Sequence, residues 1–277
     1  MDMERDGCAL AEWATRCGDA SFARHPKGFN IFITPEKIAA SDEYADSDPY
    51  SMEQDMGNEF HRLRIALTVE LAREAVAQVR GMAQVLDLGC GQGHITEAVR
   101  QALDHAELTG LDHSVSAIEY AHDHFTKIEF EAGDAYNSPY ADEFFDLVLC
   151  NNVWEHVPDP LRLLAGVAPS LKPGGFFVMS TPSRYRLGNL ARVLRGKPVG
   201  FMSRHHVTEY SVGQVKEQFA HGGFRVVRVL SRPYPMKNPA ARIARWVLNR
   251  LISLVGSHHQ LESTVFYLAQ KTAENGK

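Results

Sequence analysis

A glycine-rich loop of sequence GCGQG, at residues 89–93, follows a short apolar run and carries the strongest chemical signal in the chain. Glycines permit a tight turn and let the backbone approach a ligand closely. Asp112 ends the next apolar run, 21 residues after Gly91. A carboxylate in that place can accept hydrogen bonds from both ribose hydroxyls of an adenosine. The loop and Asp112 together predict a site for an adenosine-containing ligand.

A dinucleotide site is the main alternative for this loop. The dinucleotide fingerprint requires G-x-G-x-x-G, whereas the sixth position here is His94. The loop instead reads G-x-G-x-G, and Asp87 precedes it. The sequence therefore disfavours an NAD-dependent oxidoreductase, an interpretation that only binding of nicotinamide would revive.

Strands and helices are expected to alternate from residue 59 onward. Apolar residues at helical spacing predict a helix that begins at Glu59, includes Val79 and ends before Gly81. Beyond it, the alternation is typical of parallel strands joined by crossover helices, so we expect an α/β fold with a doubly wound, Rossmann-like sheet. The expected strands are 84–88, 107–111, 128–131, 145–150, 176–180, 224–230 and 264–269, and the expected helices are 96–103, 116–125, 160–171 and 212–220.

Five segments between Val85 and Pro182 resemble class I methyltransferases that use S-adenosylmethionine (SAM), in the order and spacing of that superfamily. VLDLGCGQG (85–93) resembles its first motif, LTGLDHS (108–114) the acidic end of strand two, and GDA (133–135) the loop that meets adenine. FDLVLCNNVWEHVPDP (145–160) and LKPGGFFVMSTP (171–182) resemble strands four and five with their loops. Within that superfamily, these segments are most similar to the small-molecule branch that includes ubiquinone-type O-methyltransferases and sugar or natural-product methyltransferases.

The resemblance implies a seven-stranded sheet with the last strand antiparallel, and SAM as the cofactor. It implies that Asp87 and the glycine loop hold the methionine part of SAM, Asp112 the ribose and Asp134 the amine of adenine. The implied cofactor-binding residues are Asp87, Gly89, Cys90, Gly91, Gly93, Asp112, His113, Asp134, Ala135, Asn151 and Asn152.

Three segments are expected to cover this domain. Residues 1–80 form an N-terminal extension and helix, and residues 81–277 form the SAM-binding domain with insertions at 183–208 and 231–262. The insertions and the N-terminal extension are the natural sources of a helical lid over the substrate. Tyr44 and Tyr50 in the extension could close over the cofactor, or they could be ordinary exposed loop aromatics.

Three histidines are candidates for a catalytic base. Methyl transfer to a hydroxyl group benefits from removal of its proton, and histidine suits that role near neutral pH. His156 stands just beyond the fourth strand, and His205 and His206 end the insertion at 183–208. Local packing for His156, and a surface pair for the other two, are the structural alternatives, and the sequence leaves them open.

A metal requirement is not expected from the sequence. His122 and His124 lie two positions apart on an expected helix and therefore face apart. His258 and His259 adjoin each other, with Glu262 as their only nearby carboxylate.

Charge is divided unevenly along the chain, which bears on the partner. Residues 1–159 carry 11 Lys/Arg against 30 Asp/Glu, whereas residues 160–261 carry 16 against two. The acidic half would repel a long polyanion, which disfavours nucleic acid. We therefore expect O-methylation of a small acceptor that is anionic or lipid-linked, with Arg192 and Arg195 near it. The alternatives are an N- or C-methyltransferase and a non-catalytic SAM-binding or interaction protein.

Residues 240–255 combine an apolar stripe with Arg242, Arg245 and Arg250. A basic amphipathic helix of this kind can lie on a bilayer as a peripheral membrane contact. A cover helix packed on the domain, or on a second copy in a homodimer, has the same pattern and is favoured. The chain has no apolar run of ~18 residues, the length of a membrane span, and no secretory signal at its N-terminus. We therefore expect a cytoplasmic protein.

Overall fold

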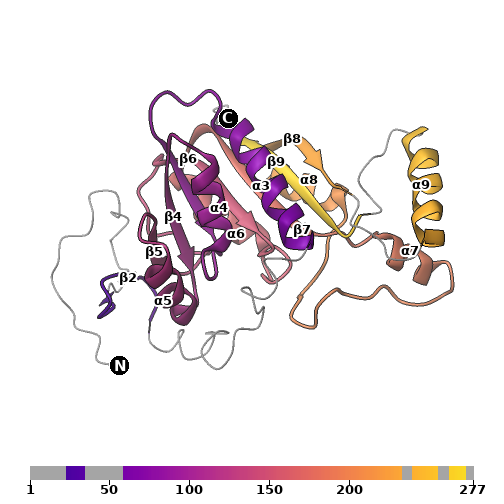
Figure 1. Ribbon diagram of the computed structural model, residues 1–277, viewed down its shortest axis with the longest axis horizontal. Coiled ribbons are helices and arrows are strands. Elements are labelled where there is room, and N and C mark those ends of the chain that lie inside the picture. Colours follow the sequence, from indigo (N-terminus) through magenta and orange to yellow (C-terminus); the bar gives the residue numbers. More distant parts are fainter. Residues whose placement is uncertain (1–22, 35–58, 233–238, 255–261, 273–277) are drawn as a thin grey trace.

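A computed structural model describes residues 23–34, 59–232, 239–254 and 262–272. Within these ranges the strands form one nine-stranded sheet in the order β1-β2-β5-β4-β3-β6-β7-β9-β8 (Figure 1). The strands are β1 (Ala23–Arg24), β2 (Asn30–Ile31), β3 (Ala83–Leu88), β4 (Ala106–Asp112), β5 (Glu129–Ala132), β6 (Phe145–Asn151), β7 (Leu171–Pro182), β8 (Phe224–Leu230) and β9 (Thr264–Lys271).

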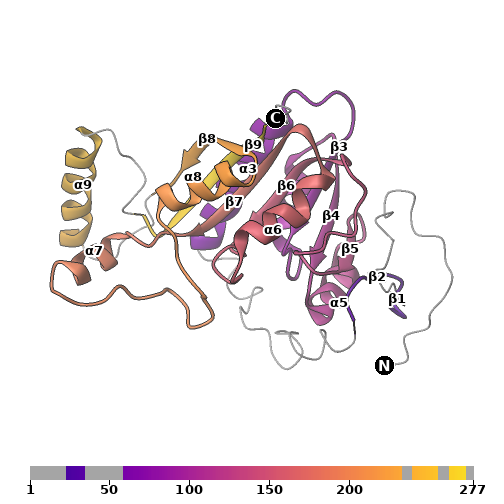
Figure 2. The same cartoon turned by 180° about the vertical axis from the view of Figure 1, so that it is seen from behind.

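Helices cover both faces of this sheet. Helices α3, α4 and α5 lie on the face that is in front in Figure 1, and α6 and α8 lie on the opposite face, in front in Figure 2. The helices are α3 (Glu59–Val76), α4 (His94–Ala102), α5 (Val115–His124), α6 (Pro160–Val167), α7 (Leu187–Val193), α8 (Val212–His221) and α9 (Pro239–Leu254), with a short 3₁₀ turn at Ala168–Ser170. Each face buries its own apolar cluster against the central strands.

The central seven strands confirm the expected Rossmann-like topology. Strands β3 to β7 are parallel to their neighbours, and β9 inserts antiparallel between β7 and β8. The connection from β5 to β6 carries the chain back past β4 and β3, so the strand order reverses between β3 and β6, which are adjacent in the sheet. Ligands of such sheets bind beyond the carboxyl ends of the strands at this switch point.

The largest departures from the sequence expectations are at three element boundaries. Helix α3 ends at Val76, and Val79 lies in the turn that follows it. Helix α6 ends at Val167, because Pro169 lacks the amide hydrogen that a longer helix would use. Strand β7 then begins at Leu171, and the register shift between Leu171 and Phe176 accommodates the Pro-Gly-Gly segment expected to stop the helix.

The described part of the N-terminal extension adds to the sheet. Ile31 of β2 pairs with Ala132 at the end of β5, and β1 pairs antiparallel with β2. Tyr44 and Tyr50, the candidate lid aromatics, lie outside the described residues. None of the helices in the described ranges is long and apolar enough to cross a membrane.

Candidate active site

The carboxyl ends of four parallel strands gather most of the residues implied to bind a cofactor. The glycine loop follows β3, Asp112 ends β4, Asp134 follows β5, and Asn151 ends β6. Adjacent parallel strands end at the same edge of a sheet, so these groups lie along one edge. This edge, from residue 87 to residue 156, is called the cofactor edge below.

The loop after β3 has a backbone that only glycine accommodates easily. Gly89, Gly91 and Gly93 have φ angles of 74°, 52° and 80°, in the left-handed region that L-residues rarely adopt. A Cβ atom on Gly89 would lie 2.3 Å from Cγ2 of Val153. Cys90 between them is half-buried with a free thiol, and burial raises the pKa of that thiol well above its ordinary value. The thiol therefore stays protonated and acts as a packing group.

Asp112 is held rigidly beside this loop. Its Oδ2 accepts the Gly91 amide at 2.8 Å, and its Oδ1 accepts the Ser114 amide at 2.9 Å. The residue is 7% exposed, and a carboxylate offers about four lone-pair positions. Two lone pairs therefore remain for ligand hydroxyls. His113, next to it, is half-exposed with Nδ1 3.4 Å from Asp112 Oδ1.

Asp134 organises the turn after β5. Its carboxylate accepts the Tyr136 amide and the Asn137 side-chain amide, both at 2.9 Å. Asp134 and Ala135 are half-buried. The carboxylate thus shapes the loop that follows β5.

Asn151 carries a buried donor that is unpaired among the described residues. Its Oδ1 accepts the hydroxyls of Thr68 and Ser180 at 3.1 and 2.9 Å. Its Nδ2 is buried and makes no hydrogen bond within the part of the chain that the structure describes. An unpaired buried donor costs about 1–3 kcal/mol, so a ligand carboxylate or carbonyl here would relieve that cost. Asn152, with φ of 55°, directs its amide to Glu155.

Asp87 is the buried carboxylate beneath the loop. It is 2% exposed and accepts the Thr96 hydroxyl at 2.6 Å. Burial raises its pKa to about 6, against the hydrogen bond from Thr96 and the positive charge of Arg64. Arg64 and Thr68 come from α3 and were not singled out in the sequence, because that helix was interpreted from its apolar stripe alone.

These groups fit the cofactor that the sequence resemblance implies. A paired carboxylate with open lone pairs suits ribose, and an unpaired amide with a nearby arginine suits a carboxylate. The raised pKa of Asp87 suits a cationic amine, which would favour its charged form.

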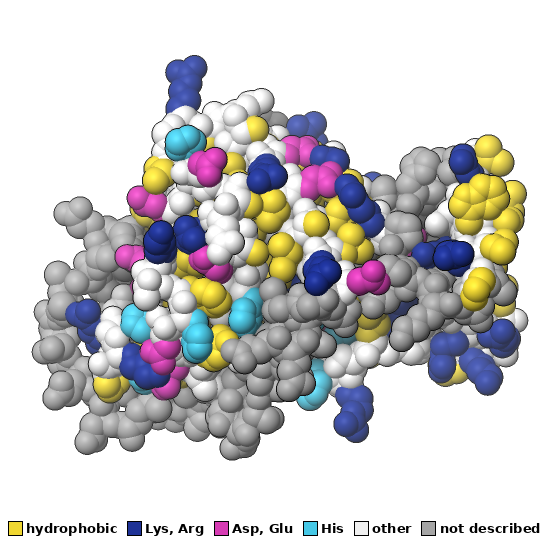
Figure 3. Space-filling view, viewed as in Figure 1, with side chains coloured by type: hydrophobic (Ala, Val, Ile, Leu, Met, Phe, Trp, Pro, Cys, Tyr) yellow, Lys and Arg dark blue, Asp and Glu magenta, His cyan; other side chains and the backbone are white. Residues whose placement is uncertain are grey.

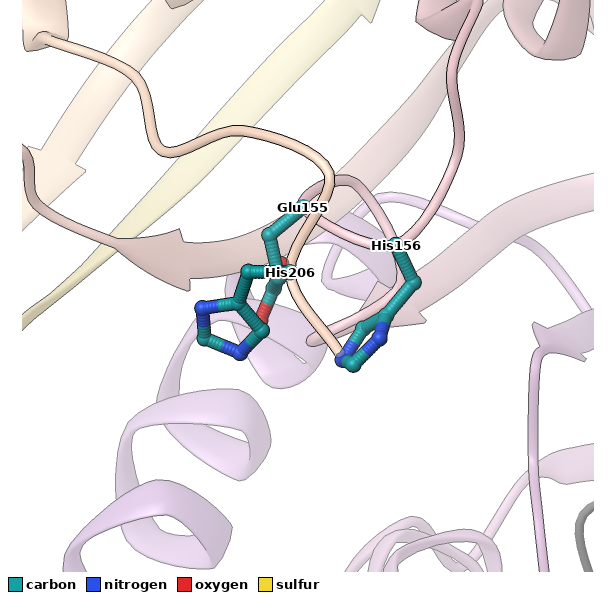
Figure 4. Close-up of side chains that lie close together, drawn as sticks. All are labelled: Glu155, His156 and His206. Carbon is teal, nitrogen blue, oxygen red and sulfur yellow. The ribbon is translucent and has the colours of Figure 1, made fainter. Parts of the chain in front are cut away.

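A second cluster lies just beyond β6. His156 follows that strand, and His206 reaches it from the end of the 183–208 insertion, so that both lie beside Glu155 (Figure 4). The two imidazole rings are 4.9 Å apart and nearly perpendicular. Glu155, His156 and His206 each offer one ligand atom, and these three atoms lie within 4.8 Å of one another. His205 is exposed and is not part of this cluster.

His206 is oriented by Glu209, a fully buried carboxylate. His206 Nδ1 lies 3.0 Å from Glu209 Oε1, which leaves Nε2 as the nitrogen for a substrate proton. Burial alone would raise the pKa of Glu209, but hydrogen bonds from His206, Arg186 and the Met202 amide lower it. Glu209 therefore remains ionised beside the imidazole.

His156 is kept neutral by its surroundings. Burial, and secondarily the nearby charge of His206, lower its pKa to about 4. An imidazole with this pKa carries no charge at neutral pH and presents one donor and one acceptor.

Glu155 and Glu209 are further residues that the sequence analysis missed. The carboxylate of Glu155 accepts the Asn152 amide and the Thr181 hydroxyl, each at 2.9 Å. Its backbone carbonyl accepts the amides of Val207 and Thr208 at 2.8 and 3.3 Å. These bonds tie the end of the insertion to the β6 loop. A carboxylate within the apolar segment VWEHV was the available signal.

Comparison with known proteins gives a family for this arrangement. The profile of a family described as "Methyltransferase domain" matches residues 80–220. A Coxiella burnetii protein named ubiquinone biosynthesis O-methyltransferase is 32% identical over 166 residues, which are 56% of this chain and 69% of that protein. An Aromatoleum aromaticum protein of the same name is 38% identical over 110 residues, covering 36% and 44% of the two chains.

Solved structures agree on the fold. A SAM-dependent methyltransferase from Archaeoglobus fulgidus superposes with a TM-score of 0.53 at 20% identity, over 81% of this chain and all of that one. The family profile ends at residue 220, so α9 lies beyond the residues that it matches.

Proposed function

Because this chain belongs to the methyltransferase domain family and is a SAM-dependent methyltransferase, we propose that it methylates an oxygen atom of a small acceptor. The observation that carries this proposal is the His206–Glu209 pair beside His156, next to the cofactor edge. A base held by a carboxylate is what deprotonation of a hydroxyl group needs. The two relatives given above are both named O-methyltransferases, which supports oxygen as the atom that is methylated.

The first task of the chain is to hold the two reactants in line. SAM, when bound, supplies a methyl group on a sulfonium, which is already a good leaving group. The glycine loop and Asp112 would fix the adenosine part, and Asp87, Arg64 and Asn151 the methionine part. Orientation of this kind is worth up to roughly 7–11 kcal/mol of a barrier.

The second task is proton removal from the acceptor. We assign the base to His206, whose Nε2 would take the hydroxyl proton as the oxygen bonds to the methyl carbon. Glu209 stabilises the imidazolium that results, and it fixes the tautomer beforehand. His156 is the neighbouring neutral imidazole, and its lowered pKa keeps a second positive charge out of the cluster. General base catalysis typically contributes ~10²–10⁴-fold.

The acceptor is proposed to be anionic or lipid-linked. The insertion at 183–208 ends at the cluster and carries six Lys/Arg without an Asp or Glu. Such a border concentrates an acceptor of opposite charge. A hydroxylated aromatic with an isoprenoid tail, the chemistry implied by the name of the Coxiella relative, is the first compound to try.

The test is transfer of tritium from labelled SAM to a panel of acceptors. The panel pairs a phenolic acceptor with and without an isoprenoid tail, a phenolic carboxylate, and an amine of matched size. We expect an O-methylated product, formed faster from the tailed or anionic phenols than from the amine. Preferential methylation of the amine would refute the proposal that the methyl group is transferred to oxygen. Binding of S-adenosylhomocysteine (SAH) without turnover of any acceptor would favour a non-catalytic binding protein.

A metal-assisted form of the same step is the second candidate, because Glu155, His156 and His206 are a possible donor set. Ligands held 2.0–2.2 Å from one zinc ion are at most about 4.4 Å apart. The three donor atoms lie within 4.8 Å of one another, so those farthest apart would have to move slightly closer together to bind one metal ion. Dialysis against EDTA distinguishes the candidates. Unchanged activity after dialysis supports a histidine base without a metal. A loss of activity that an added divalent cation reverses supports the metal-assisted step.

A further inference from the structure

Helix α9 turns its apolar side away from the protein. Five of its apolar side chains are exposed, and Leu254 at its end is 83% exposed. The five are Ile243, Trp246, Val247, Leu251 and Leu254. The sequence analysis favoured this stripe packing onto the domain or onto a second copy, and the structure does not pack it onto the described part of the domain. An exposed stripe of this size on one helix indicates a binding surface.

The polar side of α9 is the side that faces the rest of the chain. Arg245 is largely buried, with its guanidinium 3.7 Å from the carboxylate of Glu262. Asn249 donates to the same carboxylate at 3.4 Å. Glu262 stands just before β9, so these contacts tie α9 to the sheet through its polar residues. The helix is therefore oriented with its apolar stripe available to a partner.

A second exposed apolar group lies at the same end of the molecule. Helix α7 and the loop after it expose Val193, Leu194, Phe201 and Met202. Figures 1 and 2 place α7 and α9 together at the end farthest from β1 and β2. Figure 3 shows yellow apolar side chains gathered on α9, with dark blue cations beside and below them. Residues 187–202 and 239–254 are called the α7–α9 face below.

The charge of this region selects the partner. The insertion at 183–208 carries six Lys/Arg, α9 carries three, and neither segment contains an Asp or Glu. Arg186 is paired with Glu209 and Arg245 with Glu262, which leaves seven cations for the surface. Arg250 lies over the ring of Trp246, with 5.7 Å from its guanidinium carbon to the ring centre. Apolar side chains with a Trp, flanked by cations whose stems pack beside them, match the boundary between lipid tails and anionic headgroups.

We propose that the α7–α9 face docks the enzyme onto an anionic phospholipid bilayer. A second copy of the chain is a poorer occupant, because two such faces would bring like charges together. A nucleic acid is a poorer occupant because the cations surround a stripe of aliphatic side chains that no phosphate would cover. The apolar stripe would enter the upper edge of the acyl region, and the arginines would contact the headgroups.

The docking face is continuous with the candidate active site. Buried Glu209 binds the Met202 amide and Arg186 from the exposed part of the insertion, as well as His206 from the cluster. A bilayer contact at Phe201 and Met202 would therefore lie a few residues from the base. This consequence, delivery of a lipid-soluble acceptor from the membrane, rests on the proposed function, whereas the docking itself does not.

Vesicle flotation without SAM or acceptor tests the docking. The vesicles are equal parts phosphatidylcholine and phosphatidylglycerol, with pure phosphatidylcholine for comparison. We expect the full chain to float with the anionic vesicles and to bind neutral ones at least tenfold less well. Serine replacements at Ile243, Trp246 and Leu251 should reduce binding at least tenfold. Because these side chains are exposed, the variant should keep the wild-type Tm.

Matched control variants separate the face from general surface effects. Serine replacements at Met82, Leu161 and Val227, which are also exposed apolar residues, should leave flotation unchanged. Arg242→Glu with Arg250→Glu should lower anionic binding by roughly tenfold or more, since each cation near such a surface is worth about fivefold. Arg62→Glu with Arg225→Glu, exposed elsewhere, should have little effect.

Two results would overturn the proposal. One is a wild-type chain that does not float with anionic vesicles. The other is an α9 serine variant that floats as well as the wild type. Sedimentation equilibrium identifies the competing occupant: a dimer that the α9 serine variant dissociates, without vesicle binding, would assign the face to a second copy. SAH binding and methylation of a water-soluble phenol would survive either result, so the proposed function is tested separately.

Discussion

The cofactor edge and the α7–α9 face use their polar groups in opposite ways. At the cofactor edge, Asp87, Asp112 and Glu155 are buried, and each is held by hydrogen bonds from neighbouring elements. On the α7–α9 face, cations such as Arg195 and Lys197 are exposed beside exposed apolar side chains such as Leu194. The first region has a fixed geometry, and the second presents a surface.

This difference follows the division of labour in a methyl transfer. The methyl donor is common to SAM-dependent methyltransferases, so its proposed site can be rigid, and apart from Arg64 on α3 the residues assigned to it lie within the matched residues 80–220. The acceptor differs between enzymes, and α9 lies outside the matched range. His206 and Glu209 lie where the two regions meet, at the end of the insertion that begins after β7 and just beyond it.

The largest effect is expected where the regions meet. His206→Ala should lower kcat by ~10²–10⁴-fold, because the acceptor proton loses its base, while SAH affinity stays within twofold, or roughly 0.4 kcal/mol. Single-turnover transfer from labelled SAM and calorimetry with SAH measure the two quantities. His205→Ala is the control and should retain nearly full activity, since His205 is exposed. Equal losses in the two variants would remove His206 from the base role.

A pair of glycine substitutions contrasts the rigidity of the two regions. Gly89→Ala should destabilise the protein by about 2–4 kcal/mol, because its Cβ would meet Val153 and its φ is left-handed. Gly188→Ala in α7 meets nothing within 4 Å and should stabilise by about 0.5 kcal/mol through lower chain entropy. Urea denaturation measures both. A neutral Gly89→Ala would show that the loop is not tightly packed.

The pH dependence of SAM affinity sharpens the account of Asp87, whose pKa is raised to about 6. A cationic methionine amine favours the carboxylate form, so affinity should be constant above pH 6. Below that pH it should fall by up to about tenfold per unit. In the unliganded protein, the free energy of unfolding should fall as the pH rises from 3.8 to about 6, because the unfolded chain releases this proton first. Calorimetry across this range checks the first effect, and Asp87→Asn should flatten both profiles.

The smallest effect is expected on the cationic side. Replacing Arg192 and Arg195 with Ala should raise KM for the true acceptor by roughly two- to tenfold, since exposed charges contribute about 0.2–1 kcal/mol each. Added salt should raise the wild-type KM in the same direction. SAH affinity should not change. If the double variant had the wild-type KM, and that KM did not depend on salt, these charges would have no part in acceptor recognition.

The sheet and the cofactor edge were predictable from local patterns in the sequence. Buried parallel strands such as β6 form continuous apolar runs, and the positive φ angles of the loop require the glycines that mark it. Helix α8 likewise begins with a local pattern that is visible in the sequence, because Ser211 and Gln214 form both hydrogen bonds of a capping box.

The base cluster and the orientation of α9 were not predictable in the same way. His206 meets His156 because two backbone amides of the insertion bond to the carbonyl of Glu155, a register that no local pattern encodes. The stripe on α9 indicates an apolar side but not its direction. The direction depends on Glu262, which holds the opposite side through Arg245 and Asn249.

SAH calorimetry on Asp112→Ala tests most directly the claim that the carboxyl edge of the sheet holds the cofactor. The variant loses a carboxylate proposed to accept both ribose hydroxyls, so SAH binding should weaken by about 1.5–3 kcal/mol. Asp104→Ala, an exposed aspartate at the opposite end of β4, should bind SAH like the wild type. An Asp112→Ala protein with native stability and wild-type SAH affinity would contradict the account.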